Sequence, residues 1–265
     1  MKGAFTAGIL GLTVLGPGAM GTLTAQAAFE VASIRRSTSP GQGGSSSRMQ
    51  PGGSYAAANM TVQQLVAAAY GIPATRVFDG PDWASTDRYD IVAKATGSPT
   101  TEETARLLQT LLRERFMLSA RLEQRVLPVY ALMPARTGGA IGPRLWRSEV
   151  DCTDRRRPVD TSDLTARPVC GIPLLVSKGV SFFLAGDVPM STVAQALSGA
   201  AGRPVLDRTG LAGRYDISVD WASSPDVDSI SVFTAVEEQL GLKLESTTAP
   251  LDVVVIERVE RPSEN

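Results

Sequence analysis

A four-residue segment, Arg-Tyr-Asp-Ile, occurs twice in this chain of 265 residues, at 88–91 and at 214–217. Its surroundings repeat as well. Leu65 and Val193 are 128 positions apart, the two Arg-Tyr-Asp-Ile segments are 126 apart, and the stretches LPVYAL and LDVVVI are 124 apart. Small deletions in loops produce such a slow drift. The repetition therefore predicts an α+β fold made of two tandem copies of one small unit.

Apolar side chains recur at helical spacing in four stretches, two in each half of the chain. The clearest set is Val62, Leu65, Val66, Ala69 and Tyr70, at positions i, i+3, i+4, i+7 and i+8. Such a stripe predicts a helix with one buried face, and Asn59 or Thr61 can cap its start. The other helices are expected from Glu102 to about RERFML, over PMSTVAQALSGA with Asp187 as a candidate cap, and over SVFTAVEEQL.

Strands are expected between these helices. The stretches concerned are FEVASI, GGSYAAANM, RYDIVAKA, MLSARLEQ and LPVYALMP in the first half, and GVSFFLAGDV, GRYDISVDW, LKLES and LDVVVIERV in the second. GRYDISVDW alternates, with Tyr215 and Ile217 on one side and Asp216 on the other. Asp90 and Asp216 are therefore expected to face solvent or to pair with Arg88 and Arg214.

These patterns divide the chain into four parts. The expected parts are a signal peptide (1–27), a first α+β repeat (28–134) with a flexible loop at 35–53, a linker (135–178) with an expected disulfide, and a second α+β repeat (179–265).

The N-terminus resembles a secretory signal peptide. Lys2 precedes a largely apolar, uncharged stretch, and the small residues of AQA suit cleavage after Ala27. The alternative is an uncleaved membrane anchor, although Gly, Thr and Pro17 dilute the apolar run. The first interpretation predicts a periplasmic or secreted protein.

The chain has two cysteines, Cys152 and Cys170. An even count in an exported protein predicts a disulfide. The polar, Pro-containing segment between them offers little core of its own, which also favours a bridge. The alternative is a pair of free, unreactive thiols.

Composition excludes several kinds of site. The chain contains no histidine and only two cysteines, which excludes Ser-His-Asp and Cys-His nucleophilic sites and the usual zinc sites. Ser-x-x-Lys and Gly-x-Ser-x-Gly motifs are also absent from the sequence. The net charge of −1 does not indicate a nucleic-acid partner. We therefore assign no catalytic, cofactor-binding or metal-binding residue.

Carboxylates can catalyse without histidine. Two groups of aspartates lie close together in the sequence: Asp79, Asp82 and Asp87, and the pair Asp226 and Asp228. They are candidates for a carboxylate-dependent cell-wall hydrolase, while the alternative interpretation is that they are polar turn residues.

The linker contains the candidate partner contacts. Trp146 is the tryptophan that core packing explains least, whereas Trp83 and Trp221 lie at the ends of the two Arg-Tyr-Asp-Ile regions. Arg155, Arg156 and Arg157 could bind a phosphate, an acidic polymer or a lipid surface, or could form a solvated loop.

The second half, from VSFFLAGDVPMSTVAQAL to LGLKLESTTAPLDVVVI, resembles the short N-terminal domain shared by secretins and TonB-dependent receptors. That resemblance implies a small periplasmic α+β module that contacts proteins. The motifs FEVASIR, GPDW, DRYDIVAKA, GRPVLDRTGLAGRYDISVDW and VERPSEN resemble an uncharacterised exported family typical of Acidobacteria. This second resemblance implies periplasmic sensing or scaffolding.

Together, these features predict a non-enzymatic periplasmic interaction or scaffolding module. The partner would be an envelope protein or a cell-wall component, with no nucleic acid, no cofactor and no stable membrane span after signal cleavage. The alternatives are the carboxylate-dependent hydrolase and a sensor that binds a small ligand between the repeats.

Overall fold

The computed structural model describes residues 27–38, 44–136, 138–152, 163–168, 170–171, 174–224, 226 and 228–263. The chain forms two compact units: the first contains the residues up to Arg121 and those from Val254 onward, and the second contains Leu122–Val253. Within the described residues the fold has three four-stranded sheets and five α-helices. The predicted α+β class is therefore confirmed.

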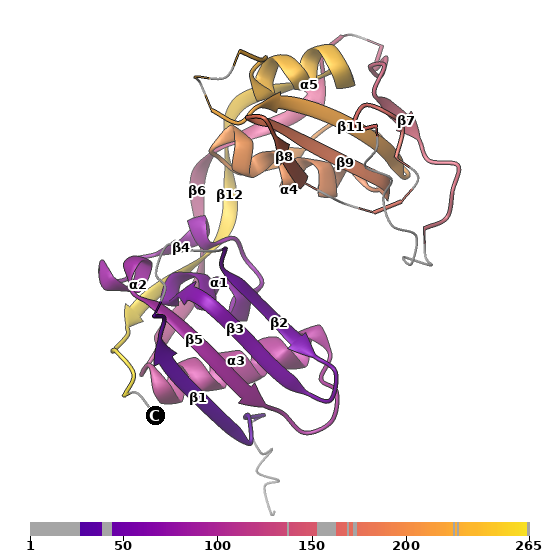
Figure 1. Ribbon diagram of the computed structural model, residues 1–265. Coiled ribbons are helices and arrows are strands. Elements are labelled where there is room, and N and C mark those ends of the chain that lie inside the picture. Colours follow the sequence, from indigo (N-terminus) through magenta and orange to yellow (C-terminus); the bar gives the residue numbers. More distant parts are fainter. Residues whose placement is uncertain are drawn as a thin grey trace, which may run out of the picture. The chain divides into compact units, whose positions relative to one another are not determined.

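The first unit is built on an antiparallel sheet, sheet A, with the strand order β1-β5-β3-β2. Its strands are β1 (Val31–Arg36), β2 (Ser46–Gln50), β3 (Ser54–Thr61) and β5 (Arg88–Lys94). The helices of this unit are α1 (Val62–Tyr70), α2 (Trp83–Thr86) and α3 (Thr101–Arg115), with a short 3-10 turn η1 (Ala74–Arg76) before strand β4 (Val77–Phe78). Figure 1 shows α1 and α3 packed against the same face of sheet A.

Local chemistry explains where these helices begin. Thr61 caps α1, because its hydroxyl accepts the backbone N–H of Gln64 while the Gln64 side chain accepts the backbone N–H of Thr61. Thr100 and Glu103 form the same reciprocal pair at α3. Both helices place their apolar stripes against sheet A, where Leu65, Leu108, Ile91 and other buried residues form one core.

The second unit contains a comparable antiparallel sheet, sheet C, with the order β7-β11-β9-β8. Its strands are β7 (Leu145–Arg147), β8 (Leu174–Ser177), β9 (Val180–Val188) and β11 (Tyr215–Ala222). Helices α4 (Met190–Ala201) and α5 (Val232–Leu240) contribute Val193, Leu197 and Val236 to a core shared with Tyr215 and Ile217.

Two long strands each contribute residues to both units. β6 (Ser119–Pro134) and β12 (Leu242–Arg258) are neighbours in sheet B, whose order is β10-β6-β12-β4, with β10 at Val205–Asp207. The sequence predicts two strands in each of these stretches, but each forms one continuous strand. The residues between the predicted strands, 125–126 and 247–250, contain no Gly, Asn or Asp to form a turn, and Pro250 lies within the continuous strand β12.

Two stretches expected to be irregular contribute strands. The loop predicted at 35–53 includes β2, and the linker predicted at 135–178 includes β7 and β8. All three are edge strands. The sequence of β2, SSRMQ, is poor in strand-forming residues, and its pairing with β3 orders it. None of the described helices is long and apolar enough to span a membrane.

We expect replacement of Gly142 by alanine to destabilise the second unit. The backbone passes so close to the end of α5 that a Cβ there would lie 2.5 Å from backbone atoms of Gln239, Leu240 and Gly241. The loss should be about 1–3 kcal/mol of unfolding free energy, measured by urea denaturation. The matched control is Gly199→Ala in α4, where the space is open, and a gain of about 0.5–1 kcal/mol is expected. Equal effects of both substitutions would contradict this prediction.

Candidate functional site

A β-bulge interrupts the strand before each of the helices α1 and α4. The register of β3 shifts between Ala57 and Met60, and the pairing of β11 with β9 shifts between Tyr215 and Ile217. Each bulge contains a residue in the left-handed region, Asn59 or Asp187, both with a φ of 56°. Asn and Asp tolerate this conformation better than other side chains that carry a Cβ.

The two Arg-Tyr-Asp-Ile segments hold these bulges in place. In the first unit, Asp90 Oδ1 accepts the backbone N–H of Asn59 at 2.8 Å, and Arg88 Nη1 donates to the Asn59 carbonyl oxygen at 2.8 Å. In the second unit, Asp216 Oδ1 accepts the backbone N–H of Asp187 at 2.9 Å, and Arg214 donates to the carbonyl oxygen of Asp187. The motif is therefore a structural clamp on the bulge.

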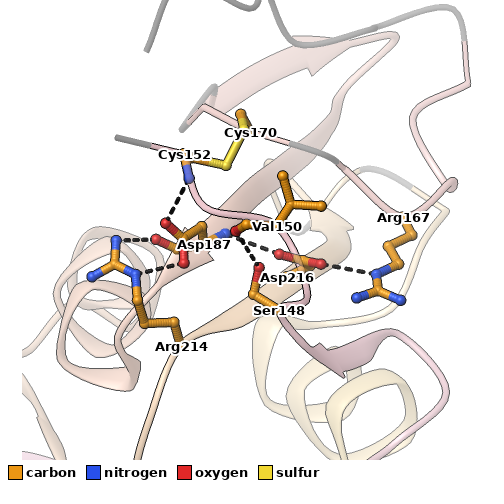
Figure 2. Close-up of a disulfide and its surroundings, with 8 residues drawn as sticks. All are labelled: Ser148, Val150, Cys152, Arg167, Cys170, Asp187, Arg214 and Asp216. Carbon is orange, nitrogen blue, oxygen red and sulfur yellow. Dashed lines mark hydrogen bonds and ion pairs between the residues drawn. A yellow bond between two sulfur atoms is a disulfide. The ribbon is translucent and has the colours of Figure 1, made fainter. Parts of the chain in front are cut away.

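The clamp of the second unit is more elaborate (Figure 2). Asp187 Oδ1 accepts from Arg214 Nε at 2.6 Å, and its Oδ2 accepts the backbone N–H of Cys152 at 3.1 Å. Asp216 Oδ2 accepts from Arg167 Nε at 2.8 Å. All four carboxylate oxygens of the two aspartates thus accept N–H groups, which offsets the cost of burying two charges.

Asp216 differs from its sequence-based expectation. Asp216 is only 2% exposed, and it forms its ion pair with Arg167 rather than with Arg214. Alternation places Asp216 on the outer face of sheet C, but a separate segment of the chain covers that face. Asp187 is not the helix cap either, since Pro189 occupies the N-cap position of α4 and the Asp187 carboxylate binds Arg214 and Cys152.

The segment that covers sheet C is residues 163–168, which we call the covering segment. The Ser218 hydroxyl donates to the Leu164 carbonyl oxygen at 3.0 Å, and Arg167 Nη2 donates to the Arg147 carbonyl oxygen at 2.7 Å. Beneath it, Ser218 is 0% exposed. Just beyond the segment, Gly171 pairs with Gly186 of β9. The covering segment and Gly171 therefore extend the packing of the second unit.

The predicted disulfide between Cys152 and Cys170 is confirmed, with an S–S distance of 2.00 Å. Both residues are buried. The disulfide joins the two ends of the stretch that contains the covering segment. Because the Cys152 backbone also binds Asp187, the disulfide, the clamp and the covering segment form one connected structure.

A cleft of about 1230 Å³ lies beside this structure in the second unit. Its lining includes Ser148, Cys152, Asp187, Thr192 and Arg214. The Ser148 hydroxyl donates to the Val150 carbonyl oxygen at 3.2 Å, and the Asp187 carboxylate is held by Arg214 and the Cys152 backbone. These polar groups are arranged to hold the chain in place. Among the described residues, no group of three Asp, Glu, His or Cys side chains could hold a metal ion.

The aspartates considered for a hydrolase lie in different surroundings. Asp79 and Asp82 are exposed near α2 in the first unit, and Asp226 and Asp228 are exposed in the second. Asp87 binds Arg261 at 2.9 Å and Arg36 at 2.7 Å, and these partners, Arg261 above all, hold the pKa of its carboxyl below the usual range.

The three tryptophans lie in three different environments. Trp146 lies half-buried in β7, opposite Asp216. Trp83 lies under the Arg261 guanidinium at 4.8 Å, and Trp221 is buried in the second core. Arg155, Arg156 and Arg157 lie outside the described residues.

A family model described as "Protein of unknown function (DUF3738)" matches residues 63–259. The chain belongs to this family. The matched range begins within α1 and ends just after β12, so that it includes residues of both units. Neither the curated proteins nor the solved structures contain a match to the chain. The prediction of an uncharacterised family is therefore confirmed.

Sequence reasoning missed Asp187 and Arg167 as parts of the clamp. A signal for Asp187 was present, because Asn59 and Asp187 are 128 positions apart, the same spacing as Leu65 and Val193. Two polar residues at matching positions just before a helix, each accompanied by an Arg-Tyr-Asp-Ile segment, indicate a shared local role. Arg167 carried no such signal, because its partner is far away in the sequence.

The first unit has a second candidate site, the outer face of sheet A. Strand alternation and register place these side chains on it: Val31, Ser33, Arg35, Ser46, Arg48, Gln50, Ser54, Ala56, Ala58, Arg88, Asp90, Val92 and Lys94. Val31 is 70% exposed and Val92 is 55% exposed. In Figure 1 the helices lie on the opposite face of this sheet. Among the described residues, no segment covers the outer face as residues 163–168 cover sheet C.

Proposed function

We propose that the chain is an exported, non-enzymatic interaction module that binds a partner in the periplasm or outside the cell. The observation that carries this proposal is the exposed outer face of sheet A. Val92 and Ser218 follow directly after the two Arg-Tyr-Asp-Ile segments, yet Val92 is 55% exposed and Ser218 is 0% exposed. We infer that a partner covers the outer face of sheet A, as residues 163–168 cover the corresponding face of sheet C.

Two features support export. The N-terminal 27 residues have the pattern of a cleaved signal peptide, and the Cys152–Cys170 disulfide suits an oxidising compartment. These features favour the periplasm or the cell exterior as the place where the partner is met.

We also infer that the two units descend from one duplicated α+β unit that resembles the short N-terminal domain of secretins and TonB-dependent receptors, within an exported family typical of Acidobacteria. Sheets A and C place an Arg-Tyr-Asp-Ile strand at the same position in their order. The Asp and Arg of that strand make the same two bonds to a left-handed bulge residue. Each unit would then pair its closing strand with one that belongs to the other half of the sequence, through β6 and β12.

The state of the buried aspartates favours interaction over hydrolysis. Asp187 and Asp216 are the two acidic residues that are buried within the described part of the chain, and every oxygen of both already accepts an N–H. A general acid needs a carboxyl group that can carry and release a proton at the substrate. The clamp uses these carboxylates for structure instead.

The test is site-specific photo-crosslinking in the producing cell, with a photoreactive amino acid at Val92 and, as control, at Glu238 on the exposed surface of α5. We expect the full chain labelled at Val92 to form a discrete crosslinked species and the Glu238 variant to form none. Export and disulfide formation, checked in both variants, exclude misfolding. If the folded, exported Val92 variant forms no adduct, this face binds no partner and the proposal loses its basis.

A further inference from the structure

We propose that the outer face of sheet A binds an acidic segment of a partner protein, laid in extended form across the strands. This inference rests on the proposed function and names the chemistry of the partner. It follows from the charges on the face, from the small side chains at its centre, and from the way the second unit covers its own sheet.

The face is basic at its periphery. Arg35 on β1 and Arg48 on β2 are exposed, and neither forms an ion pair with any described residue. Lys94 donates to the Gly52 carbonyl oxygen, which leaves its positive charge without a carboxylate partner in the described part of the chain. Asp90 is the one carboxylate on the face, and its Oδ1 accepts the Asn59 N–H. Arg88, the fourth cation, donates to the Asn59 carbonyl oxygen and to the Ser45 hydroxyl. Four cations against one carboxylate make the face complementary to an acidic partner.

The centre of the face is flat. Ser33, Val92 and Ala56 are directly opposite one another on β1, β5 and β3, and Arg48 of β2 continues the same row. Small side chains allow a second peptide backbone to approach closely. The described outward residues of sheet A include no aromatic side chain on which a sugar ring could stack, so the surface suits a peptide better than a glycan.

The spacing of the arginines suits an extended peptide. Arg35 and Arg48 lie on the two edge strands, three strand steps or about 14 Å apart across the sheet. Arg48 is in the row of Ser33, two residues from Arg35, which adds about 7 Å along the strands and gives a separation of about 16 Å. In an extended chain, side chains at positions i and i+4 are separated by about 13 Å and point to the same side. The long, flexible side chains of arginine and glutamate span the difference of about 3 Å, so a segment with glutamates at i and i+4 can reach both arginines at once.

In the second unit, a peptide segment covers the outer face of sheet C and pairs a cation with a carboxylate of that face. The outer face of sheet C carries Asp216 and Asp220, and the cations that meet them, Arg167 and Arg144, come from outside its two central strands. Arg167 belongs to the covering segment, whose Leu164 also accepts a hydrogen bond from the sheet. The covering segment contains Asp163 as well as Arg167, so it has no net charge, and the match to the face is the pairing of one arginine with one buried aspartate. On the outer face of sheet A the charges without an ion-pair partner among the described residues are cations, so the matching partner is acidic.

The test measures binding of a fluorescently labelled, extended peptide with glutamates at i and i+4 to the chain purified after export, by fluorescence anisotropy. The first control is the same peptide with lysines in place of the two glutamates. We expect the glutamate peptide alone to bind, and binding to weaken when salt is raised from about 0.05 M to about 0.5 M. The double variant Arg35→Glu/Arg48→Glu should weaken binding by about tenfold or more.

The matched control is Arg136→Glu/Arg208→Glu, which makes the same charge change at exposed arginines of the second unit. Its affinity should stay within about twofold of the wild type. Unchanged binding in Arg35→Glu/Arg48→Glu, or equal loss in both double variants, would overturn the inference. Binding of phosphatidylglycerol vesicles through Arg35 and Arg48, without peptide binding, would overturn it in favour of a lipid surface.

The crosslinking and peptide-binding experiments together separate the proposed function from the acidic-segment proposal. If photo-crosslinking at Val92 yields an adduct while the glutamate peptide does not bind, the face is an interaction surface for a partner of different chemistry. The proposed function then stands and the acidic segment is rejected. If neither experiment gives a signal, both proposals fail together.

Discussion

Replacement of Asp216 by alanine is expected to lower the free energy of unfolding of the second unit by about 3 kcal/mol. The substitution removes the acceptor of the Asp187 backbone N–H and the ion-pair partner of Arg167. The N–H is buried with its residue, which is 7% exposed, so that it cannot recover a bond to water. The Arg167 side chain is 36% exposed and is partly solvated after the loss, and this is why we do not expect a larger effect.

Two further variants separate the contributions. Asp216→Asn keeps an oxygen that can accept the Asp187 N–H and loses the charge that binds Arg167, so that it should cost less than alanine. Asp90→Ala at the corresponding place in the first unit removes one such bond from a half-buried residue, and a loss of about 1 kcal/mol is expected. The measurement is urea unfolding of each variant. Equal losses for Asp90→Ala and Asp216→Ala would show that the covering segment adds nothing to the clamp.

Removal of the disulfide, in the variant Cys152→Ser/Cys170→Ser, is expected to cost about 3 kcal/mol. The two cysteines are 18 positions apart, and the bridge limits the freedom of this loop in the unfolded chain. A second effect acts in the folded state. Without the bridge, the Cys152 backbone is no longer held against Asp187, while the covering segment keeps the hydrogen bonds of Arg167 and Leu164.

Hydrogen exchange distinguishes these two effects. In the disulfide-free variant, the amide of residue 152, which donates to Asp187 Oδ2, should exchange faster than unfolding of the whole unit permits. The amide of Ala235 in α5 of the same unit, which donates to the Ser231 carbonyl oxygen, is the internal control and reports the unfolding of the whole unit. If both amides change in parallel, the disulfide acts through global stability alone. If neither changes, the bridge does not support the clamp.

Local patterns predicted much of the fold because they follow from local physics. The apolar stripe that begins at Val62 became α1, and the Thr61 hydroxyl caps it as helix starts require. The same reasoning located α3, α4 and α5. The long strands β6 and β12 were not predicted, because whether a chain turns back or continues depends on which strand lies beside it. That choice is made by contacts between residues far apart in the sequence.

The candidate site also combines features that local sequence predicts with features that depend on distant contacts. Two cysteines in a chain with a signal-like N-terminus were enough to predict the disulfide. Strand alternation correctly placed Asp216 opposite the core-facing Tyr215 and Ile217, yet it could not show that this second face is covered as well. Arg167, 49 positions before Asp216, becomes its partner only through the folding of the loop between the cysteines.

By itself, the sequence determined the α+β class, the positions of four helices, the pairing of Cys152 with Cys170 and the range of chemistry that a chain without histidine can perform. These depend on composition and on residues close together along the chain. The tertiary structure alone decided that Arg-Tyr-Asp-Ile is a clamp, and that the outer face of sheet A is open while that of sheet C is covered. A side chain on a strand is buried or exposed according to what packs on it, and periodicity carries no information about that distant segment.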